Sequence, residues 1–513
     1  MQALMMSGSS SADFRQDNSV RDIPSSDGAH LASLDTTNSD PAVLVDLEAS
    51  PGTLPGVRLI SPNTSSSESR HDLIARGIVS VEKAESYCLA YQGLLDHFLY
   101  GIVGPYGEGV AGMVNIMKTN TALFTAVCTV GALHLVSSDF ERLRSDFVTM
   151  STELGLTKRS SRHDVLALCI GAFWLDELSW ALVGIAVRLA LELQLYRGFS
   201  KALAGDYEQY LNIRTYFLVY ICDHHFSIPY GRPPMTRECE AVRNARKLLD
   251  CTHSTEEDIR LVSQVLRWSI CTDAYESLDG SADRQLSDAE IHQMRRLNVA
   301  LDGLHAEWAG RLTTHFHVGN YPRKAANLQY HFAKLYVGSF AFRALRSDTS
   351  GRRLLGEGKD MSDLSSLAIS SATSILRIVV SDSELTSYLH GLPAYFHTMI
   401  TFAIVFLLRL LTRCSITPLQ LDMQEAQQLL FDLVGILRRA TSVMHPHHPL
   451  VHITKGLNDV LEKDGVIARP SIDATVPMNG GDDEVLLQPP MLQGDFSFLD
   501  DESFNQMWMT GFG

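Results

Sequence analysis

The chain has 513 residues, of which 45% are hydrophobic and 20% charged, and its formal net charge is −16. These proportions are ordinary for a globular protein with a sizeable core, and at about 100–200 residues per domain the length allows several domains or one large helical body. The acidic balance argues against a surface devoted mainly to phosphate contact, because nucleic-acid binders usually carry a basic face.

The eight cysteines are scattered, and no C-x-x-C pair occurs. This spacing predicts buried, reduced thiols in the cytosol or nucleus, since disulfide frameworks belong to small secreted domains. The N-terminus lacks the charged and apolar segments of a signal peptide. The longest apolar run, Met399–Leu408, is shorter than the roughly 20 residues of a membrane span. We therefore expect a soluble protein without membrane contact.

The N-terminal segment, residues 1–75, is rich in Ser, Asp, Asn, Thr and Pro, and its hydrophobic residues are sparse and aperiodic. Such a segment cannot bury enough apolar surface to offset its ordering entropy, so it is predicted to be disordered.

Residues 76–464 show helical periodicity, with apolar residues three and four positions apart. The stretch Asn120–Val136 is apolar all round and predicts a buried helix. Arg188 and Glu192 are four residues apart in the next strongly apolar segment and are expected to pair.

A helix is predicted from Arg214 to Ser227, where the following prolines and glycine end it. Further helices are predicted at Glu257–Ser277, Asp288–Arg311, Pro322–Ser347, Asp363–Asp382, Pro393–Arg413 and Met423–Val443. No alternating strand pattern lies between them, so the fold class is predicted to be all-α, a multi-helix body flanked by disordered tails. The polar segments 275–290 and 348–362 are expected to be loops within this body.

The C-terminal segment, residues 465–513, combines glycine and proline breaks with acidic and aromatic residues and is also predicted to be disordered. Carboxylates keep aromatic side chains solvated until these enter an apolar groove of a coactivator. The segment is therefore interpreted as an activation segment; the alternative is that it docks on its own helical body. Its candidate partner-binding residues are Phe496, Phe498, Leu499, Phe504, Trp508, Met509 and Phe512.

The stretch Arg214–Thr236 resembles the signature of the fungal-specific transcription factor domain, the middle homology region of the fungal zinc-cluster regulators. Leu182–Gly198, Asn327–Leu345 and His448–Leu457 resemble further helices of that family, in the same order. The signature residues, read as structural, are Arg188, Arg214, Tyr220, Asp223, Gly231, Arg232, Pro233 and Pro234.

The resemblance implies an activator of RNA polymerase II genes in a fungal nucleus, with coactivator partners and a homodimeric or heterodimeric helical domain. The family's zinc cluster needs six grouped cysteines, but no cysteine precedes Cys88. Direct DNA contact and a zinc cofactor are therefore not carried over unless such a module precedes this sequence. Two alternatives stay open: an adaptor or inhibitor that pairs with a full-length zinc-cluster factor, and a metabolite-sensing helical module.

Histidine clusters suggest metal sites, but the residue pattern favours structural roles. His224 and His225 follow Asp223 directly and point about 100° apart on a helix, so Asp223 is expected to pair with Arg232 or to cap the next turn. The turn with His445, His447, His448 and His452 is interpreted as a loop that ends a helix, rather than a zinc or nickel site.

Enzyme motifs are also missing from the sequence: there is no G-x-S-x-G, H-E-x-x-H or dinucleotide-binding fingerprint. We therefore expect no catalytic residue, metal ligand or cofactor.

Overall fold

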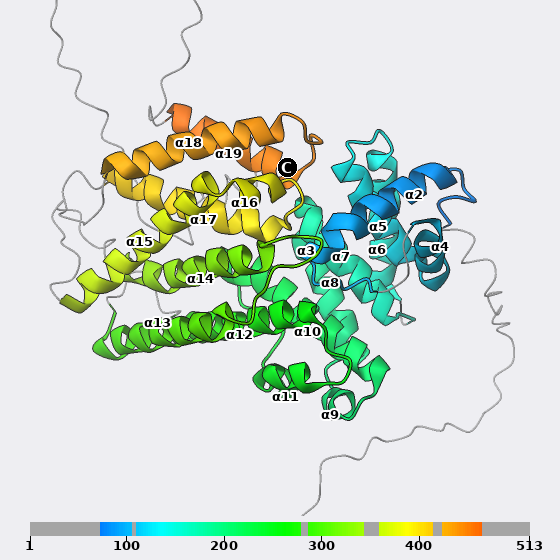
Figure 1. Cartoon of the computed structure of the whole chain (residues 1–513), viewed down its shortest axis with the longest axis horizontal. Coiled ribbons are helices and arrows are strands. Elements are labelled where there is room, and N and C mark those ends of the chain that lie inside the picture. The colour runs from blue at the N-terminus through cyan, green and yellow to red at the C-terminus, as the bar shows by residue number, and fades with distance from the viewer. Residues whose placement is uncertain are drawn as a thin grey trace, which may run out of the picture. The chain divides into compact units, whose positions relative to one another are not determined.

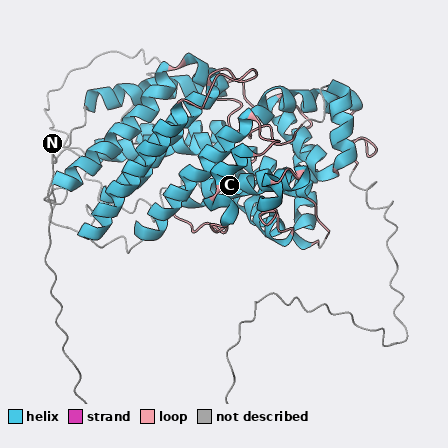
Figure 2. Ribbon diagram, turned by 60° about the horizontal axis from the view of Figure 1, so that its bottom comes forward, coloured by secondary structure: helices cyan, strands magenta, loops and turns pink. Residues whose placement is uncertain are grey.

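The computed structural model describes residues 72–104, 109–157, 159–278, 286–342, 359–413 and 423–463 (Figure 1). Within these ranges all regular elements are helical, and the one β interaction is an isolated bridge between His315 and Gly319 (Figure 2). The all-α prediction is thus confirmed. The greater part of the N-terminal segment and the whole C-terminal segment lie outside the described residues.

The first half of the body begins at Asp72 and ends with the signature helix. Its elements are α2 (Val81–Ala90), the π-helical turn η1 (Tyr91–Leu95), α3 (Asp96–Phe98), α4 (Gly109–Thr119), α5 (Thr121–His134), α6 (Phe140–Leu156), α7 (Arg162–Trp174), the 3₁₀ turn η2 (Asp176–Leu178), α8 (Ser179–Glu192), α9 (Phe199–Leu203) and α10 (Tyr207–Ser227). Leu73, which the predicted boundary at residue 75 places in the N-terminal segment, is buried in the core of this body.

The second half begins directly after the signature helix. Its elements are η3 (Ile228–Tyr230), α11 (Glu240–Arg243), η4 (Ala245–Asp250), α12 (Glu256–Leu278), α13 (Asp288–Ala309), α14 (Tyr321–Ser339), α15 (Lys359–Ser381), α16 (Ser383–Tyr388), α17 (Ala394–Arg413), α18 (Met423–Thr441) and α19 (Pro449–Lys463). Neighbouring long helices pack in succession: α12 on α13, α13 on α14, α14 on α15, and α18 on α19 (Figure 1).

Helix α5 is buried on every side from Ala122 to Leu133, as its uniformly apolar sequence predicted. It packs against α2, α4, α6 and α7. The Asn120 side chain caps its N-terminus by accepting a hydrogen bond from the Leu123 amide at 2.8 Å. A Cβ at Gly131 would lie 2.3 Å from the Tyr87 carbonyl oxygen, so glycine permits the close crossing of α5 and α2.

Helix α10 connects the two halves, because it contacts α7, α8 and α9 on one side and α12 on the other. It ends at Ser227, as predicted, but begins at Tyr207 rather than Arg214. The earlier start has a local cause: the Asp206 side chain accepts a hydrogen bond from the Gln209 amide at 3.1 Å.

Helix α15 corrects the expectation that no segment reaches the length of a membrane span. Met361–Ser381 is long enough, and its mean hydropathy is 1.5. However, 56% of the most apolar stretch of this helix is buried, and α15 packs against α14, α17 and α18. The core helix of a soluble protein passes the same test, so hydropathy alone does not make α15 a membrane helix.

Candidate functional site

Arg214 of the signature helix forms a buried ion pair. Its Nε donates to Asp258 Oδ1 at 2.6 Å, and its Nη2 donates to the Tyr100 carbonyl at 2.7 Å. The second oxygen of Asp258 accepts from the Tyr210 hydroxyl at 2.6 Å. The cluster joins α10 to α12 and to the chain after α3, and every charge in it has a partner. Arg214 therefore has a structural role: it links these three segments of the body.

Asp223 caps the turn after the signature helix, which is one of the two alternatives drawn from the sequence. Its Oδ2 accepts hydrogen bonds from both the amide and the hydroxyl of Thr236 at 2.6 Å, and its Oδ1 accepts from the Ser227 hydroxyl at 3.1 Å. Arg232 takes another partner: its guanidinium lies 4.6 Å from the ring centroid of Trp180 on α8.

The turn Gly231–Pro234 is built into the body. Gly231 has a φ of +66°, in the left-handed region that a side chain disfavours, and it ends η3. The Arg232 amide donates to the Ser227 carbonyl at 3.0 Å. Pro233 and Pro234 then lead the chain away from the helix. This arrangement has no glycine-rich loop running into a helix N-terminus, the usual frame of a phosphate site.

The two adjacent histidines of α10 diverge, as their spacing predicts. The Nδ1 of His224 is 2.7 Å from the carbonyl of Tyr220, the preceding signature residue, while the His225 ring stacks on Tyr395 with centroids 3.8 Å apart. Both are buried, and burial lowers the pKa of His224 to about 4. They are neutral core residues at physiological pH.

Arg188 of α8 pairs with Glu192 at 3.0 Å, which confirms the predicted ion pair. Its Nη2 also donates to the carbonyls of Leu154 and Gly155 at the C-terminal end of α6. A cation at this end satisfies free carbonyls and complements the helix dipole.

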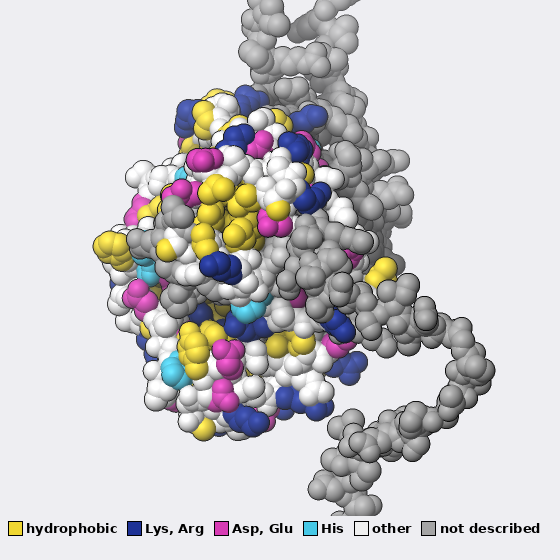
Figure 3. Space-filling model, turned by 90° about the vertical axis from the view of Figure 1, so that its right-hand side faces the viewer, with side chains coloured by type: hydrophobic (Ala, Val, Ile, Leu, Met, Phe, Trp, Pro, Cys, Tyr) yellow, Lys and Arg dark blue, Asp and Glu magenta, His cyan; other side chains and the backbone are white. Residues whose placement is uncertain are grey.

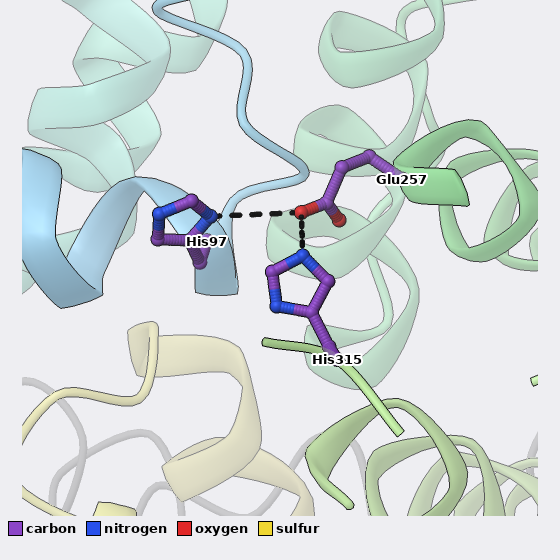
Figure 4. A group of neighbouring side chains, drawn as sticks. All are labelled: His97, Glu257 and His315. Atoms are coloured by element: carbon purple, nitrogen blue, oxygen red, sulfur yellow. Dashed lines mark ion pairs between the residues drawn. The ribbon is translucent and has the colours of Figure 1, made fainter. Parts of the chain in front are cut away.

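Three residues far apart in the sequence, His97, Glu257 and His315, meet in a cluster that sequence reasoning missed (Figure 4). Glu257 Oε1 lies 2.8 Å from His315 Nε2 and 3.6 Å from His97 Nδ1. Arg260 binds the other oxygen, Oε2. Burial raises the pKa of Glu257, but the Arg260 charge and the hydrogen bonds from the two imidazoles outweigh it and hold that pKa far below its usual range.

The tautomer of His315 argues against a metal in this cluster. Its Nδ1 accepts the His317 amide at 3.2 Å, so Nε2 carries the proton that is donated to Glu257. A metal on Nε2 requires the opposite tautomer, and Arg260 already supplies the positive charge. The arrangement is therefore a hydrogen-bonded ion cluster that joins α3, α12 and the turn before α14.

The histidine-rich turn between α18 and α19 is a loop after a helix, as predicted, but it packs on two carboxylates from η2. His448 points inward and donates from Nε2 to the His390 carbonyl at 2.9 Å. His447 and His452 instead face Asp176 and Glu177. No sequence pattern could have indicated this contact, because η2 and the turn lie in opposite halves of the chain.

A pocket of about 360 Å³ lies among α12, α13 and α14, lined in part by Arg267, Arg323, Lys324, His305 and Trp308. Arg267 is buried and donates to the Gln329 side chain at 3.1 Å. Among the described residues no carboxylate forms an ion pair with it, and burial lowers the pKa of Arg267 to about 10. The pocket thus offers an incompletely compensated cation beside an aromatic wall.

One face of the molecule mixes charges of both signs around a patch of hydrophobic side chains (Figure 3). In this view no continuous basic stripe of the kind that follows a nucleic-acid backbone is visible. The predicted partner-binding residues of the C-terminal segment, from Phe496 to Phe512, lie outside the described residues.

Comparison with known proteins gives one informative relative. The chain is 33% identical over 402 residues to the "Transcriptional activator of proteases prtT" of Emericella nidulans. It is similar to a fungal transcriptional activator. The aligned region covers 76% of this chain but 59% of the relative, so the chain spans about three-fifths of that protein's length. No family model matches the chain, and the middle homology region stays a prediction.

Proposed function

We propose that this protein regulates transcription by RNA polymerase II in a fungus, as an activator that works in the nucleus. The observation that carries the proposal is the 33% identity to a fungal transcriptional activator over most of this chain. The all-α body supports it, because its signature residues Arg214 and Asp223 build internal junctions instead of a reaction centre. The similarity is to a regulator, not to an enzyme.

In this proposal the helical body regulates and the acidic-aromatic segment activates. Three of the signature side chains, Arg214, Tyr220 and Asp223, are buried, so we assign contacts with the transcription machinery to other parts of the chain. Residues 465–513 place the seven candidate partner-binding side chains, from Phe496 to Phe512, among carboxylates, a composition suited to apolar coactivator grooves.

The test is a reporter assay with residues 465–513 fused to a heterologous DNA-binding domain. We expect activation, and we expect it to be lost when Phe498, Phe504 and Trp508 are replaced by alanine. A matched control replaces the interleaved polar residues Ser497 and Asn505 and should keep activity. An inactive fusion, or equal loss in both variants, would count against the proposal.

We further propose that the protein reaches DNA through a partner factor that carries a zinc cluster. The support is that none of the cysteines in the described part of the chain belongs to a group that could hold a metal ion. A binding assay with the purified 513-residue chain and random-sequence duplex DNA tests this. Selection of a specific site by the chain alone would contradict it.

A second candidate function, sensing of a small metabolite, is favoured by the pocket among α12, α13 and α14. The buried Arg267, with Arg323, suits a carboxylate or phosphate group, and Trp308 suits an apolar portion of the same ligand. Lys324 also lines the pocket, but it already pairs with Asp382 and Glu384. An anion there would compensate a guanidinium that burial has made costly.

Thermal unfolding with a panel of small carboxylates and phosphate esters tests this candidate. A true ligand should stabilise the protein by RT ln(1 + [L]/Kd). The gain should vanish in Arg267→Met and persist in Arg246→Gln, which changes an arginine paired with Glu307 outside the pocket lining. Equal gains in wild type and Arg267→Met would reject the site.

A further inference from the structure

We propose that the histidine-rich turn before α19 and the 3₁₀ turn η2 together bind one Zn²⁺ ion. The ligands are His447, His452 and Glu177, with Asp176 as the carboxylate beside His452. This site is independent of the proposed transcriptional function. It reverses the sequence-based reading of the turn as a loop without metal.

The spacing of the candidate ligand atoms suits a small cation. One ligand atom each from Glu177, His447 and His452 lies within 4.8 Å of the others. His447 Nδ1 is 3.7 Å from Glu177 Oε1, and His452 Nδ1 is 3.6 Å from Asp176 Oδ2. Two ligands of a tetrahedral zinc with bonds of about 2.1 Å stand about 3.4 Å apart, so small side-chain movements would close the shell.

The hydrogen bond that His447 makes through Nε2 leaves its Nδ1 available as a metal ligand. Its Nε2 lies 2.8 Å from Glu141 Oε1 and donates to that carboxylate. The neutral ring therefore presents its Nδ1 lone pair toward Glu177. A carboxylate behind a histidine ligand is the usual second shell of a zinc site, since it fixes the tautomer and raises the basicity of the ligand.

Two inward-facing atoms have only distant partners. Asp176 Oδ2 and His447 Nδ1 are inaccessible to solvent; Asp176 Oδ2 faces His452 Nδ1 at 3.6 Å, and His447 Nδ1 faces Glu177 Oε1 at 3.7 Å. The Asp176 side chain is only 10% exposed. A buried carboxylate oxygen with a partner only at this distance is poorly compensated, and a cation at this point would relieve that cost.

The charges around the site leave room for a divalent ion. Glu141, Asp176 and Glu177 contribute three carboxylates. Arg144 pairs with Glu177 Oε2, and the imidazoles of His447 and His452 face the same carboxylates. In the His97–Glu257–His315 cluster, by contrast, Arg260 supplies the cation and His315 has the wrong tautomer for a metal. Of the two clusters, the one at the turn before α19 is therefore the better candidate for a metal site.

A bound ion would join two distant parts of the chain. Asp176 and Glu177 lie between α7 and α8, whereas His447 lies just before α19, the last described helix, and His452 lies in its first turn. The ligands are far apart in the sequence, so a bound ion would close a very long loop. Binding would therefore favour the state in which α19 is packed on the body over the state in which it is detached.

The experiment uses the full 513-residue chain, stripped with a chelator and then titrated with zinc sulfate. Calorimetry and metal analysis should give one Zn²⁺ per chain, with a rise in Tm. The double variant His447→Ala/His452→Ala should lose this binding, and the matched variant His97→Ala/His315→Ala should keep it. Cobalt in place of zinc should show the intense visible bands of a tetrahedral site.

Glu141→Gln provides a second variant that does not threaten folding, because Glu141 is 58% exposed. It replaces the carboxylate behind His447 by an uncharged, weaker acceptor and should weaken zinc binding by about 10–100-fold. The proposal is overturned if the wild-type chain holds no zinc, or if zinc stays bound in His447→Ala/His452→Ala. Loss of zinc only in His97→Ala/His315→Ala would also overturn it, by assigning the ion to the other cluster.

Discussion

At the scale of single residues, partners and burial separate side chains that look alike in the sequence. Asp223 and Glu192 are both acidic residues on helices with a polar neighbour in reach. Asp223 is fully buried and accepts three hydrogen bonds, whereas Glu192 lies at the surface and pairs with Arg188. Loss of the Asp223 carboxylate would leave buried hydrogen-bond donors without an acceptor, whereas loss of the Glu192 carboxylate would not.

Asp223→Asn should lower the free energy of unfolding by about 1–3 kcal/mol, because the amide group turns one acceptor into a donor that faces other donors. Glu192→Gln removes an exposed ion pair and should cost less than about 1 kcal/mol. Urea denaturation of both variants and the wild type measures the difference. Equal losses would show that the Asp223 cluster contributes no more than a surface pair.

At the scale of elements, the close approach of α5 and α2 depends on the missing side chain of Gly131. A Cβ there would overlap the Tyr87 carbonyl, which is backbone and cannot rotate away. Gly303 on α13 is the opposite case, since a Cβ at that position would meet nothing within 4 Å. The same substitution should therefore have opposite effects on the two helices.

Gly131→Ala should destabilise the protein by about 1–3 kcal/mol through overpacking. Gly303→Ala should stabilise it by about 0.5–1 kcal/mol, because alanine is the better helix former. Thermal and urea unfolding measure both. If Gly131→Ala were as stable as the wild type, α5 and α2 would not cross as closely as described.

At the scale of the whole molecule, buried histidines make the body sensitive to acid. Burial lowers the pKa of His134, His224 and His397 from 6.5 to about 4. Between these values the unfolded chain binds protons that the folded chain does not. The free energy of unfolding therefore falls as the pH falls, by about 1.4 kcal/mol per pH unit for each histidine.

Asp96 opposes this trend below pH 6, because burial raises its pKa from 3.8 to about 6 and the folded chain then binds the extra proton. The three histidines outweigh this one carboxyl group.

Urea midpoints should therefore fall between pH 7 and pH 5. His134→Gln should flatten the profile. A midpoint that does not change with pH would contradict the buried, neutral state of these histidines.

The sequence by itself determined the all-α class and the places of the main helices, because a periodicity of 3.6 residues and proline or asparagine boundaries are local signals. It also determined that His224 and His225 cannot share one ion, since adjacent residues on a helix diverge. It missed that α10 starts as early as Tyr207, where the Asp206 side chain caps the helix.

Only the tertiary structure decided which distant residues meet. His97, Glu257 and His315 come from three separate segments, and Asp176 lies far from His452 in the chain. The Arg267 pocket likewise needs three packed helices to exist. Helix periodicity indicates which face of a segment is buried, but not which partner buries it. The candidate binding sites depend on that pairing, and so a single sequence could not reveal them.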